Sequence, residues 1–250
     1  MSLKRLLVAL AFCLASITVA AEPLRVALAP DYMPLAFKQD GKLMGIEVDN
    51  AREVGKILGR EIRFVEMPSN EYVEALNTGR VDVVMSGYSI TPERTREVDF
   101  ATPFMEIGQM AIILAENAAA LAPPRALHQP GVRIGVEPGT TGEKYVRENL
   151  PQAQVVNHSN APSAFLALRK RAIDAYIHDA PTSWNLASSR DNQDLLSLYR
   201  PLTREQLAWA VRKGNTDLLG RLNDALARLT ANGRLSAIQN YWIPVTVQVR

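Results

Sequence analysis

The chain has 250 residues, of which 47% are hydrophobic and 22% are charged, a composition that excludes intrinsic disorder and allows one sizeable core or two smaller ones. Lys4 and Arg5 account for the excess of 28 basic over 26 acidic residues, so the rest of the chain is neutral, and a nucleic-acid partner, which requires basic excess, is not expected. Cys13 is the sole cysteine, which excludes a disulfide framework and a thiolate metal site.

The N-terminal segment has the pattern of a secretory signal peptide. Two basic residues precede an apolar run from Leu6 to Ile17, and small residues follow this run. The run is short for a membrane span, so we predict a signal peptide over residues 1–21, cleaved near Ala20 or Ala21, and export to the periplasm. The alternative is that the same run anchors the chain in a membrane.

Strands and helices alternate in the next part of the chain. The pattern predicts, in order, a strand at 24–29, a helix at 45–59, a strand at 61–67, a helix at 70–78 and a strand at 81–87. Alternation of this kind is typical of a mainly parallel sheet that is covered by helices on both faces. We therefore expect one α/β lobe here.

A similar order of elements restarts after Pro130. The pattern predicts a strand at 131–136, a helix at 142–149, a strand at 153–158, a helix at 162–171 and a strand at 172–179. The alanine- and proline-containing stretch 116–130 is predicted to be the loop between the two halves. The predicted fold class is therefore α/β, with two similar lobes in tandem and a cleft between them.

The C-terminal part adds a strand and helices to these lobes. Residues 205–215 form an apolar run that predicts one strand. Leucines then recur at helical spacing as far as Asn232 and Gly233, namely Leu218, Leu219, Leu222, Leu226 and Leu229. We interpret these leucines as core residues.

The stretch "VVMSGYSITPERTREVDFATPF", residues 83–104, changes from apolar to small and polar at Ser86, where the third strand ends. Ligands of open α/β sheets bind beyond the carboxyl ends of the strands. Thr91 can cap the following helix and Pro92 suits its first position, so Arg94 is expected in the first turn, near the strand end. A guanidinium held there can bind a carboxylate with two hydrogen bonds, although pairing with a neighbouring glutamate, Glu93 or Glu97, is the alternative.

The second lobe supplies two further candidates. Thr140, Thr141 and Gly142 begin a helix directly after a strand, and the free N–H groups of a helix N-terminus bind anions. Asp179 ends the last strand of the lobe and suits a cation, although it could instead cap the next turn. An arginine, a helix N-terminus and an aspartate together form a site for a small zwitterion.

Together these stretches resemble the extracellular solute-binding proteins of family 3, the periplasmic receptors of polar amino-acid ABC transporters. The resemblance covers essentially the whole mature chain, and it rests on five motifs: "GIEVDNAREVGKILG", "LNTGRVDVVMSGYSITPERTREVDFATPF", "GVRIGVEPGTTGEKYV", "AIDAYIHDAP" and "NGRLSAIQNYW". It implies the two-lobed periplasmic-binding-protein fold of type II. It also implies a protein that captures an amino acid by lobe closure and delivers it to an inner-membrane ABC permease, as a monomer and without cofactor or metal.

The resemblance also implies where the chain passes between the lobes. The crossings are expected near 104–108 and 203–207. The lobes then comprise residues 22–108 for the first lobe, 109–202 for the second, and 203–250 for the second crossing and the return to the first lobe.

The family's ligand-binding residues match residues of this chain one by one. Arg94 corresponds to the arginine that binds the ligand's α-carboxylate, and Ser89 and Thr141 assist it. Thr141 lies at a helix N-terminus to which Thr140 also belongs. Asp179 corresponds to the aspartate that binds the α-ammonium group. The Gly87 carbonyl and Ser86 correspond to groups beside that aspartate. Tyr32 corresponds to the aromatic wall against which the ligand's side chain stacks.

Two departures from the family pattern concern the ligand's side chain. This chain has Ala29 where receptors of basic amino acids or glutamine have an aspartate, and Ser69 beside Asn70 where many members have a second aromatic residue. These departures disfavour lysine, arginine and histidine as ligands, although the nearby Asp31 weakens that inference.

An enzyme and a sensor are the alternative functions. Residues 130–156 also resemble the periplasmic cyclohexadienyl dehydratases, which share this fold, but Thr182 lies where they have a glutamate as general acid, so we expect no enzyme activity. A soluble sensor would need a separate membrane partner. The histidines, His128, His158 and His178, lack metal-ligand spacing.

Overall fold

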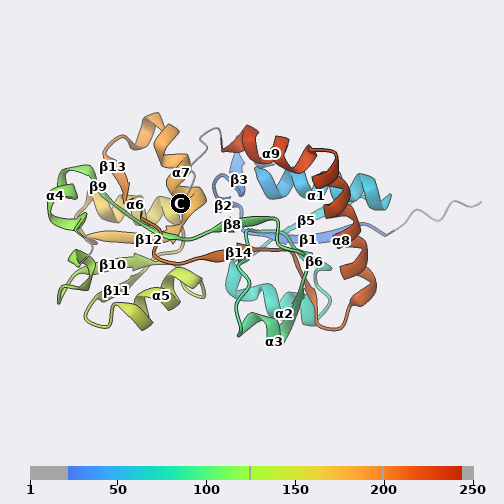
Figure 1. Cartoon of the computed structure of the whole chain (residues 1–250), viewed down its shortest axis with the longest axis horizontal. Coiled ribbons are helices and arrows are strands. Elements are labelled where there is room, and N and C mark those ends of the chain that lie inside the picture. Colours follow the sequence, from blue (N-terminus) through green and yellow to red (C-terminus); the bar gives the residue numbers. More distant parts are fainter. Residues whose placement is uncertain (1–21, 124, 199, 244–250) are drawn as a thin grey trace, which may run out of the picture.

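The structure is a computed structural model that describes residues 22–123, 125–198 and 200–243. The predicted signal peptide, residues 1–21, and the C-terminal residues 244–250 lie outside the described residues. The described chain forms two α/β lobes side by side, each built on its own five-stranded sheet (Figure 1).

Lobe 1 is the part of the molecule built around the sheet with strand order β5-β1-β6-β15-β7. The strands are β1 (Leu24–Leu28), β5 (Ile62–Glu66), β6 (Val83–Val84), β7 (Val98–Phe100) and β15 (Ala210–Arg212). The strands β5, β1 and β6 are parallel, and β15 is antiparallel to β6 and β7. The helices are α1 (Ile46–Leu58), α2 (Tyr72–Asn77), α3 (Arg94–Glu97), α8 (Thr216–Ala231) and α9 (Arg234–Trp242).

A small antiparallel sheet lies beside the main sheet of lobe 1 and carries residues that reach the other lobe. Its strands are β2 (Asp31–Tyr32), β3 (Ala36–Gln39) and β4 (Lys42–Met44). Helix α1 begins directly after this sheet, at Gly45, where the backbone has φ 120°. A Cβ atom there would lie 2.4 Å from the carbonyl oxygen of Leu35, so only glycine fits at this junction.

Lobe 2 is built around the sheet with strand order β11-β10-β12-β9-β13. The strands are β9 (Gln109–Leu114), β10 (Arg133–Val136), β11 (Gln154–Asn157), β12 (Ala175–Asp179) and β13 (Leu195–Leu198). The strands β11, β10 and β12 are parallel, and β9 is antiparallel to β12 and β13. The helices are α4 (Ala118–Leu121), α5 (Thr141–Asn149), α6 (Ala161–Arg169) and α7 (Ala180–Ser188).

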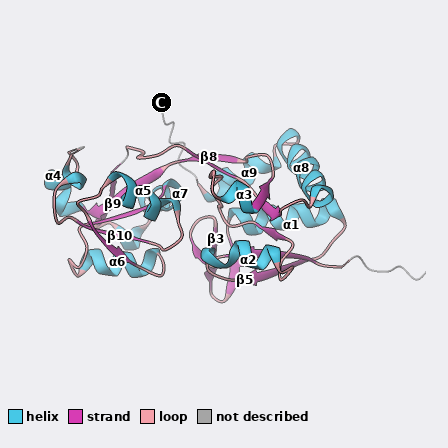
Figure 2. Cartoon of the chain, turned by 90° about the horizontal axis from the view of Figure 1, so that it is seen from below, coloured by secondary structure: helices cyan, strands magenta, loops and turns pink. Residues whose placement is uncertain are grey.

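Two strands run between the lobes. They are β8 (Met105–Ile107) and β14 (Glu205–Leu207), which pair antiparallel with each other (Figure 1). After β14 the chain continues into β15, and the helices α8 and α9 that follow pack on α1 of lobe 1, as Figure 2 shows from another side. The lobe boundaries at residues 108 and 202 stay our prediction.

Hydrophobic clusters cover both faces of each sheet. In lobe 1, Val26 belongs to the cluster under α1 and α8, whereas its neighbour Ala27 belongs to the cluster under α2. In lobe 2, Tyr176 and Ile177 point to opposite faces in the same way. This arrangement explains why the parallel strands are apolar without alternation in the sequence. The helix leucines Leu218, Leu222, Leu226 and Leu229 are buried, as predicted, and Leu219 is partly buried.

Three predicted elements are wrong in their extent. Of the strand predicted at 81–87, only Val83–Val84 is a β-strand. Residues 205–215 are two strands rather than one, because β14 pairs with β8 whereas β15 pairs with β6 and β7, and the chain changes partner at Ala208 and Trp209. The stretch 116–130 is not only loop, since it contains α4, the 3₁₀ turn Ala126–His128 and most of the 3₁₀ turn Ala115–Asn117.

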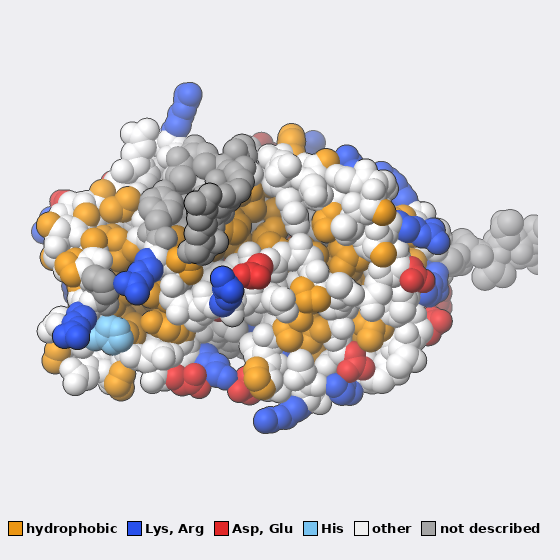
Figure 3. Space-filling view, in the orientation of Figure 1, with side chains coloured by type: hydrophobic (Ala, Val, Ile, Leu, Met, Phe, Trp, Pro, Cys, Tyr) orange, Lys and Arg blue, Asp and Glu red, His pale blue; other side chains and the backbone are white. Residues whose placement is uncertain are grey.

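The surface agrees with the balanced charge of the sequence. On the face in Figure 3, Lys and Arg side chains are interspersed with Asp, Glu and uncharged side chains. Within the described residues, no helix is both long and apolar enough to cross a membrane.

Candidate functional site

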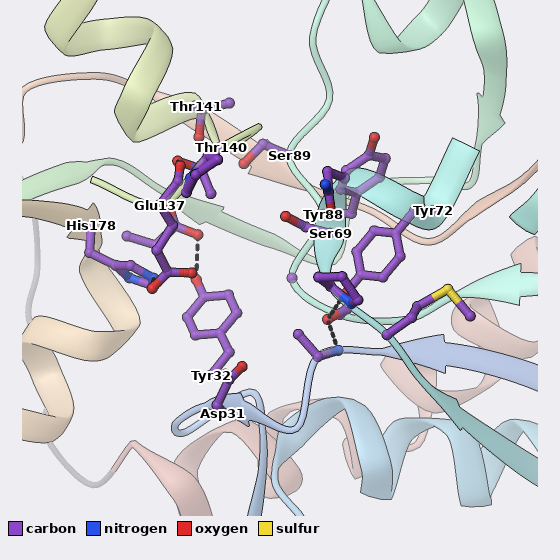
Figure 4. A pocket seen from close by; sticks show the side chains of 18 of the residues that line it. Asp31, Tyr32, Ser69, Tyr72, Tyr88, Ser89, Glu137, Thr140, Thr141 and His178 are labelled. Atoms are coloured by element: carbon purple, nitrogen blue, oxygen red, sulfur yellow. Dashed lines mark hydrogen bonds and ion pairs between the residues drawn. The ribbon is translucent and has the colours of Figure 1, made fainter. Parts of the chain in front are cut away.

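A cavity of about 550 Å³ lies between the two lobes, and residues of both lobes line it. Figure 4 shows it from close by. All the residues predicted as ligand-binding line this one cavity: Tyr32, Ser86, Gly87, Ser89 and Arg94 from lobe 1, and Thr140, Thr141 and Asp179 from lobe 2. Their contacts with a ligand stay predictions.

Arg94 is the first residue of α3, and its backbone N–H donates to Thr91 Oγ1 at 3.2 Å. Its guanidinium is fixed by three contacts: Nη1 donates to the Ser89 carbonyl at 2.8 Å, Nη2 donates to the Gly139 carbonyl at 3.1 Å, and Cζ lies 3.9 Å from the centroid of the Tyr88 ring. Within the described part of the chain, no carboxylate forms an ion pair with this guanidinium. It is therefore oriented by neutral groups and available to a carboxylate.

Among the described residues, neither alternative partner of Arg94, Glu93 or Glu97, forms an ion pair with it. Glu93 forms an ion pair with Lys144 of α5 in lobe 2, with 2.6 Å between Oε1 and Nζ. This contact joins the two lobes, so Glu93 does not bind the neighbouring arginine.

The N-terminus of α5 is held by a reciprocal cap. The Thr140 hydroxyl accepts from the Glu143 N–H at 3.2 Å and donates to the Glu137 carbonyl at 2.7 Å, while the Glu143 carboxylate accepts from the Gly139 N–H at 2.8 Å. Because these contacts occupy the Thr140 hydroxyl, its proton is not available to a ligand. The Thr141 hydroxyl accepts from Gln109 Nε2 at 3.0 Å and keeps its proton available for the cavity.

Asp179 ends β12 and lies beside α7, but its side chain does not cap that helix. One carboxylate oxygen accepts from the Tyr32 hydroxyl of lobe 1, and the other accepts from Gln109 Nε2. Burial raises the pKa of the Asp179 carboxyl, although the neighbouring His178 opposes the shift. The described residues give it no ion-pair partner, so a ligand ammonium group would be its natural counterion.

Gln109 is a site residue that sequence reasoning missed. It is 1% exposed, and its Nε2 group lies within hydrogen-bond distance of Asp179, Thr141 and Glu205, the last at 3.1 Å. It begins β9, directly after the first crossing between the lobes. The only signal in the sequence is one polar residue at the start of a buried apolar strand, which is too weak to assign a role.

Glu137 and His178 form a second pair that sequence reasoning missed. The Glu137 carboxylate accepts from the Tyr176 hydroxyl at 2.5 Å and lies 3.4 Å from His178 Nε2. Burial opposes ionisation of both groups, but their mutual attraction outweighs it, lowering the pKa of Glu137 and raising that of His178. His178 Nδ1 lies 2.9 Å from the Thr182 hydroxyl, so this histidine is fixed on both sides. Among the described residues, no group of His, Cys, Asp and Glu could hold a metal ion.

Glu47 fixes the backbone at Gly87, shortly after the end of β6. This fully buried residue of α1 accepts from the Gly87 N–H at 2.9 Å and from Trp209 Nε1 at 3.0 Å. Gly87 has φ 61°, and a Cβ atom there would lie 2.3 Å from Leu35 Cδ1 and 2.8 Å from Tyr32 Cε1. Glycine is therefore required between the cavity and the core.

The buried Glu47 predicts a pH dependence of stability. Burial raises its pKa from 4.5 to about 7, although the N–H donors of Gly87 and Trp209 oppose the shift. The folded state then favours the protonated form, so the contribution of Glu47 to stability is present below pH 4.5 and is lost as the pH rises through about 7. We expect the unfolding free energy of wild type minus that of Glu47→Gln to fall by about 3 kcal/mol between pH 4.5 and pH 8. Urea titrations across this range measure it, and a constant difference would contradict the prediction.

Further contacts hold the lobes against each other around the cavity. Asn160 Nδ2 of lobe 2 donates to Asp31 Oδ2 of lobe 1 at 3.1 Å, and the Thr182 hydroxyl lies 3.4 Å from the Met33 carbonyl oxygen. With the Tyr32–Asp179 hydrogen bond, these contacts place β2 and the residue after it against lobe 2. The lobes are therefore closed on one another in this structure.

Comparison with known proteins identifies relatives over most of the chain. The model of the bacterial extracellular solute-binding proteins, family 3, matches residues 24–245. The L-cystine-binding protein TcyJ of Escherichia coli (strain K12) is 32% identical over 225 residues, 90% of this chain and 84% of that protein. The ABC transporter arginine-binding protein 1 of the same organism is 30% identical over 246 residues, 94% of this chain and 98% of that protein.

A solved structure supports the same fold. The ancestral amino acid-binding protein AncCDT-1, described as a precursor of cyclohexadienyl dehydratase, superposes with a TM-score of 0.82 at 33% identity. The match covers 88% of this chain and 95% of that one.

Proposed function

The chain belongs to the bacterial extracellular solute-binding proteins, family 3, and on this premise we propose that it captures a free amino acid between its lobes and delivers it to an ABC transporter. One observation carries the proposal. Arg94 of lobe 1 and Asp179 of lobe 2 line the same cavity, and among the described residues neither forms an ion pair. These are the charges that the carboxylate and the ammonium group of an amino acid require.

The remaining site residues receive roles that fit their hydrogen bonds. Ser89 and Thr141 assist Arg94 at the α-carboxylate, and the Thr140 turn contributes backbone N–H groups of the helix N-terminus. The Gly87 carbonyl accompanies Asp179 at the ammonium group, with Ser86 nearby. The Ser86 hydroxyl accepts from Tyr72 and from the Ala29 N–H, which uses both of its lone pairs, so its own proton is available to an acceptor atom of the ligand and not to the ammonium group. Tyr32 forms the wall against which the ligand's side chain packs.

Export and assembly follow from the same proposal. The protein acts in the periplasm after cleavage near Ala20 or Ala21, as a monomer that docks on an inner-membrane ABC permease. Lobe 1 comprises residues 22–108 and 203–250, and lobe 2 comprises residues 109–202. The pairing of β8 with β14 supports crossings near 104–108 and 203–207.

We propose binding rather than catalysis for this site. The dehydratase alternative needs a general acid where this chain has Thr182, whose hydroxyl does not ionise near neutral pH. The Thr182 hydroxyl is also buried and lies against His178, which supports a structural role.

A ligand panel tests the proposed function. A ligand that binds only the folded state at a hundredfold excess over its Kd adds about 2.7 kcal/mol of stability, so the cognate amino acid should raise the Tm by about 5 to 10 °C. The decarboxylated analogue of that amino acid is the matched control and should give no shift, because it lacks the group that Arg94 binds. The absence of a shift with every amino acid would contradict the proposal. Prephenate and arogenate belong in the panel, and product formation from either would favour the enzyme.

A further inference from the structure

The cavity between the lobes carries more negative charge than an α-amino and an α-carboxyl group require. Among the described residues, its lining contains four carboxylates, Asp31, Glu66, Glu137 and Asp179, and one Lys or Arg, Arg94. A bound amino acid uses Arg94 for its carboxylate and Asp179 for its ammonium group. Each of the other three carboxylates either has a cationic partner within the protein or is free to meet a cation on the ligand's side chain.

The protein itself neutralises two of these three. Glu66 forms an ion pair with Lys38, with 2.7 Å between Oε2 and Nζ. Glu137 pairs with His178 and accepts a further hydrogen bond from Tyr176. Both carboxylates thus have a cationic partner that belongs to the chain.

Asp31 has no such partner among the described residues. Its Oδ2 atom accepts from the neutral amide of Asn160 at 3.1 Å. That amide is held in place, because Asn160 Oδ1 accepts from the Ser163 N–H at 3.0 Å and so caps α6. Burial raises the pKa of Asp31, as expected for a carboxylate that lacks a counterion, although the Asn160 hydrogen bond opposes the shift.

The position of Asp31 suits the side chain of a ligand. Figure 4 shows it beside the backbone of Tyr32, while the Tyr32 ring extends toward His178 and Glu137. Asp31 is thus separate from Asp179, whose carboxylate meets the far end of that ring at the Tyr32 hydroxyl. A ligand that packs on Tyr32 and places its ammonium group at Asp179 can extend its side chain toward Asp31.

We propose that Asp31 selects α-amino acids whose side chain carries a cation, an ammonium or a guanidinium group. This inference rests on the proposed function and reverses the expectation drawn from Ala29. The same charge balance disfavours ligands with a second carboxylate, because Arg94 is the one Lys or Arg that the described residues contribute to the lining, and the α-carboxylate already uses it.

Arginine and citrulline test the inference, because they share their shape and differ in the charge of the terminal group. Calorimetric titration should show that wild type binds arginine at least about tenfold more tightly than citrulline. Asp31→Asn should remove most of this preference by weakening arginine binding, and citrulline binding should change by less than about threefold. Lysine and norleucine provide a second pair of the same kind.

Glu66→Gln is the matched control, since Glu66 also lines the cavity but has Lys38 as its counterion. It should leave the preference for arginine unchanged. The inference is overturned if wild type binds citrulline as tightly as arginine and norleucine as tightly as lysine, a comparison that needs no variant. It is also overturned if Asp31→Asn keeps the full preference. Either result leaves the proposed function intact, whereas binding of no amino acid at all would overturn the proposed function.

Discussion

Arg94→Ala is expected to weaken amino-acid binding by about 2 to 5 kcal/mol, or roughly thirtyfold to several thousandfold. The guanidinium is half-buried and oriented by the carbonyl groups of Ser89 and Gly139, so its free N–H groups are already directed when a ligand arrives. Without it, the α-carboxylate would be enclosed between the lobes with no cation beside it. Calorimetric titration with the cognate amino acid measures the loss.

Arg96→Ala is the matched control for this prediction. Arg96 lies on the same short helix, but it is exposed and does not line the cavity. Its removal should leave affinity unchanged within about twofold, because exposed charges contribute little. The melting curve of the unliganded Arg94→Ala protein should change little. A structural role for Arg94 would produce the opposite pattern, with a lower Tm and near-normal affinity.

Arg94 could be placed from the sequence because the signals around it are local. A strand that ends in small polar residues, followed by Thr91 and Pro92, specifies a helix start, and the structure has α3 beginning at Arg94 with Thr91 as its hydrogen-bond acceptor. The limits of α1 were predictable to within one residue for the same reason, since Gly45 and Gly59 both have positive φ.

Contacts between distant segments could not be predicted in this way. The pairing of Glu93 with Lys144 joins residues 51 positions apart on different lobes, so the sequence suggested only neighbours as partners. Each sheet also contains an antiparallel strand that pairs with a strand distant in the sequence, β9 with β12 in lobe 2 and β15 with β6 in lobe 1. Such pairings depend on the path of the chain in the folded protein. The division of residues 205–215 into β14 and β15 was missed because an apolar run does not specify its pairing partner.

The part of the cavity that would hold the ligand's side chain shows the same difference between local sequence signals and long-range contacts. On the family pattern Ala29 disfavours basic ligands and the nearby Asp31 weakens that inference, but the sequence does not show whether Asp31 has a counterion. The fold instead brings Asp31 and Glu137 to the same cavity from opposite lobes, and it gives only Glu137 a cationic partner. The electrostatics of a cleft depend on which charges are already paired, and pairing is a property of the folded chain.

Asp179→Ala is expected to weaken amino-acid binding by about 2 to 5 kcal/mol, or roughly thirtyfold to several thousandfold, as for Arg94→Ala. The Asp179 carboxylate is half-buried and accepts hydrogen bonds from Tyr32 and Gln109, both neutral donors. Neither donor supplies a positive charge, so the ammonium group of the ligand would be the counterion of the ionised carboxylate, which has acceptor sites left for that group. Asp179→Asn, which removes the charge and keeps the shape, should lose most of the same affinity.

Thr182→Val separates this effect from a general disturbance of the site. Thr182 is buried on α7, three residues after Asp179, and contacts His178, but it offers no charge to a ligand. We expect the affinity of the Thr182→Val protein for the amino acid to stay within a few-fold of that of wild type. In the unliganded protein, Asp179→Ala removes a half-buried carboxylate that has no ion-pair partner among the described residues, but it also removes two hydrogen bonds. Because these effects oppose each other, the melting temperature should change little. Near-normal affinity in both Asp179 variants, together with a lower melting temperature, would mean that Asp179 holds Tyr32 and Gln109 in place and does not bind an ammonium group.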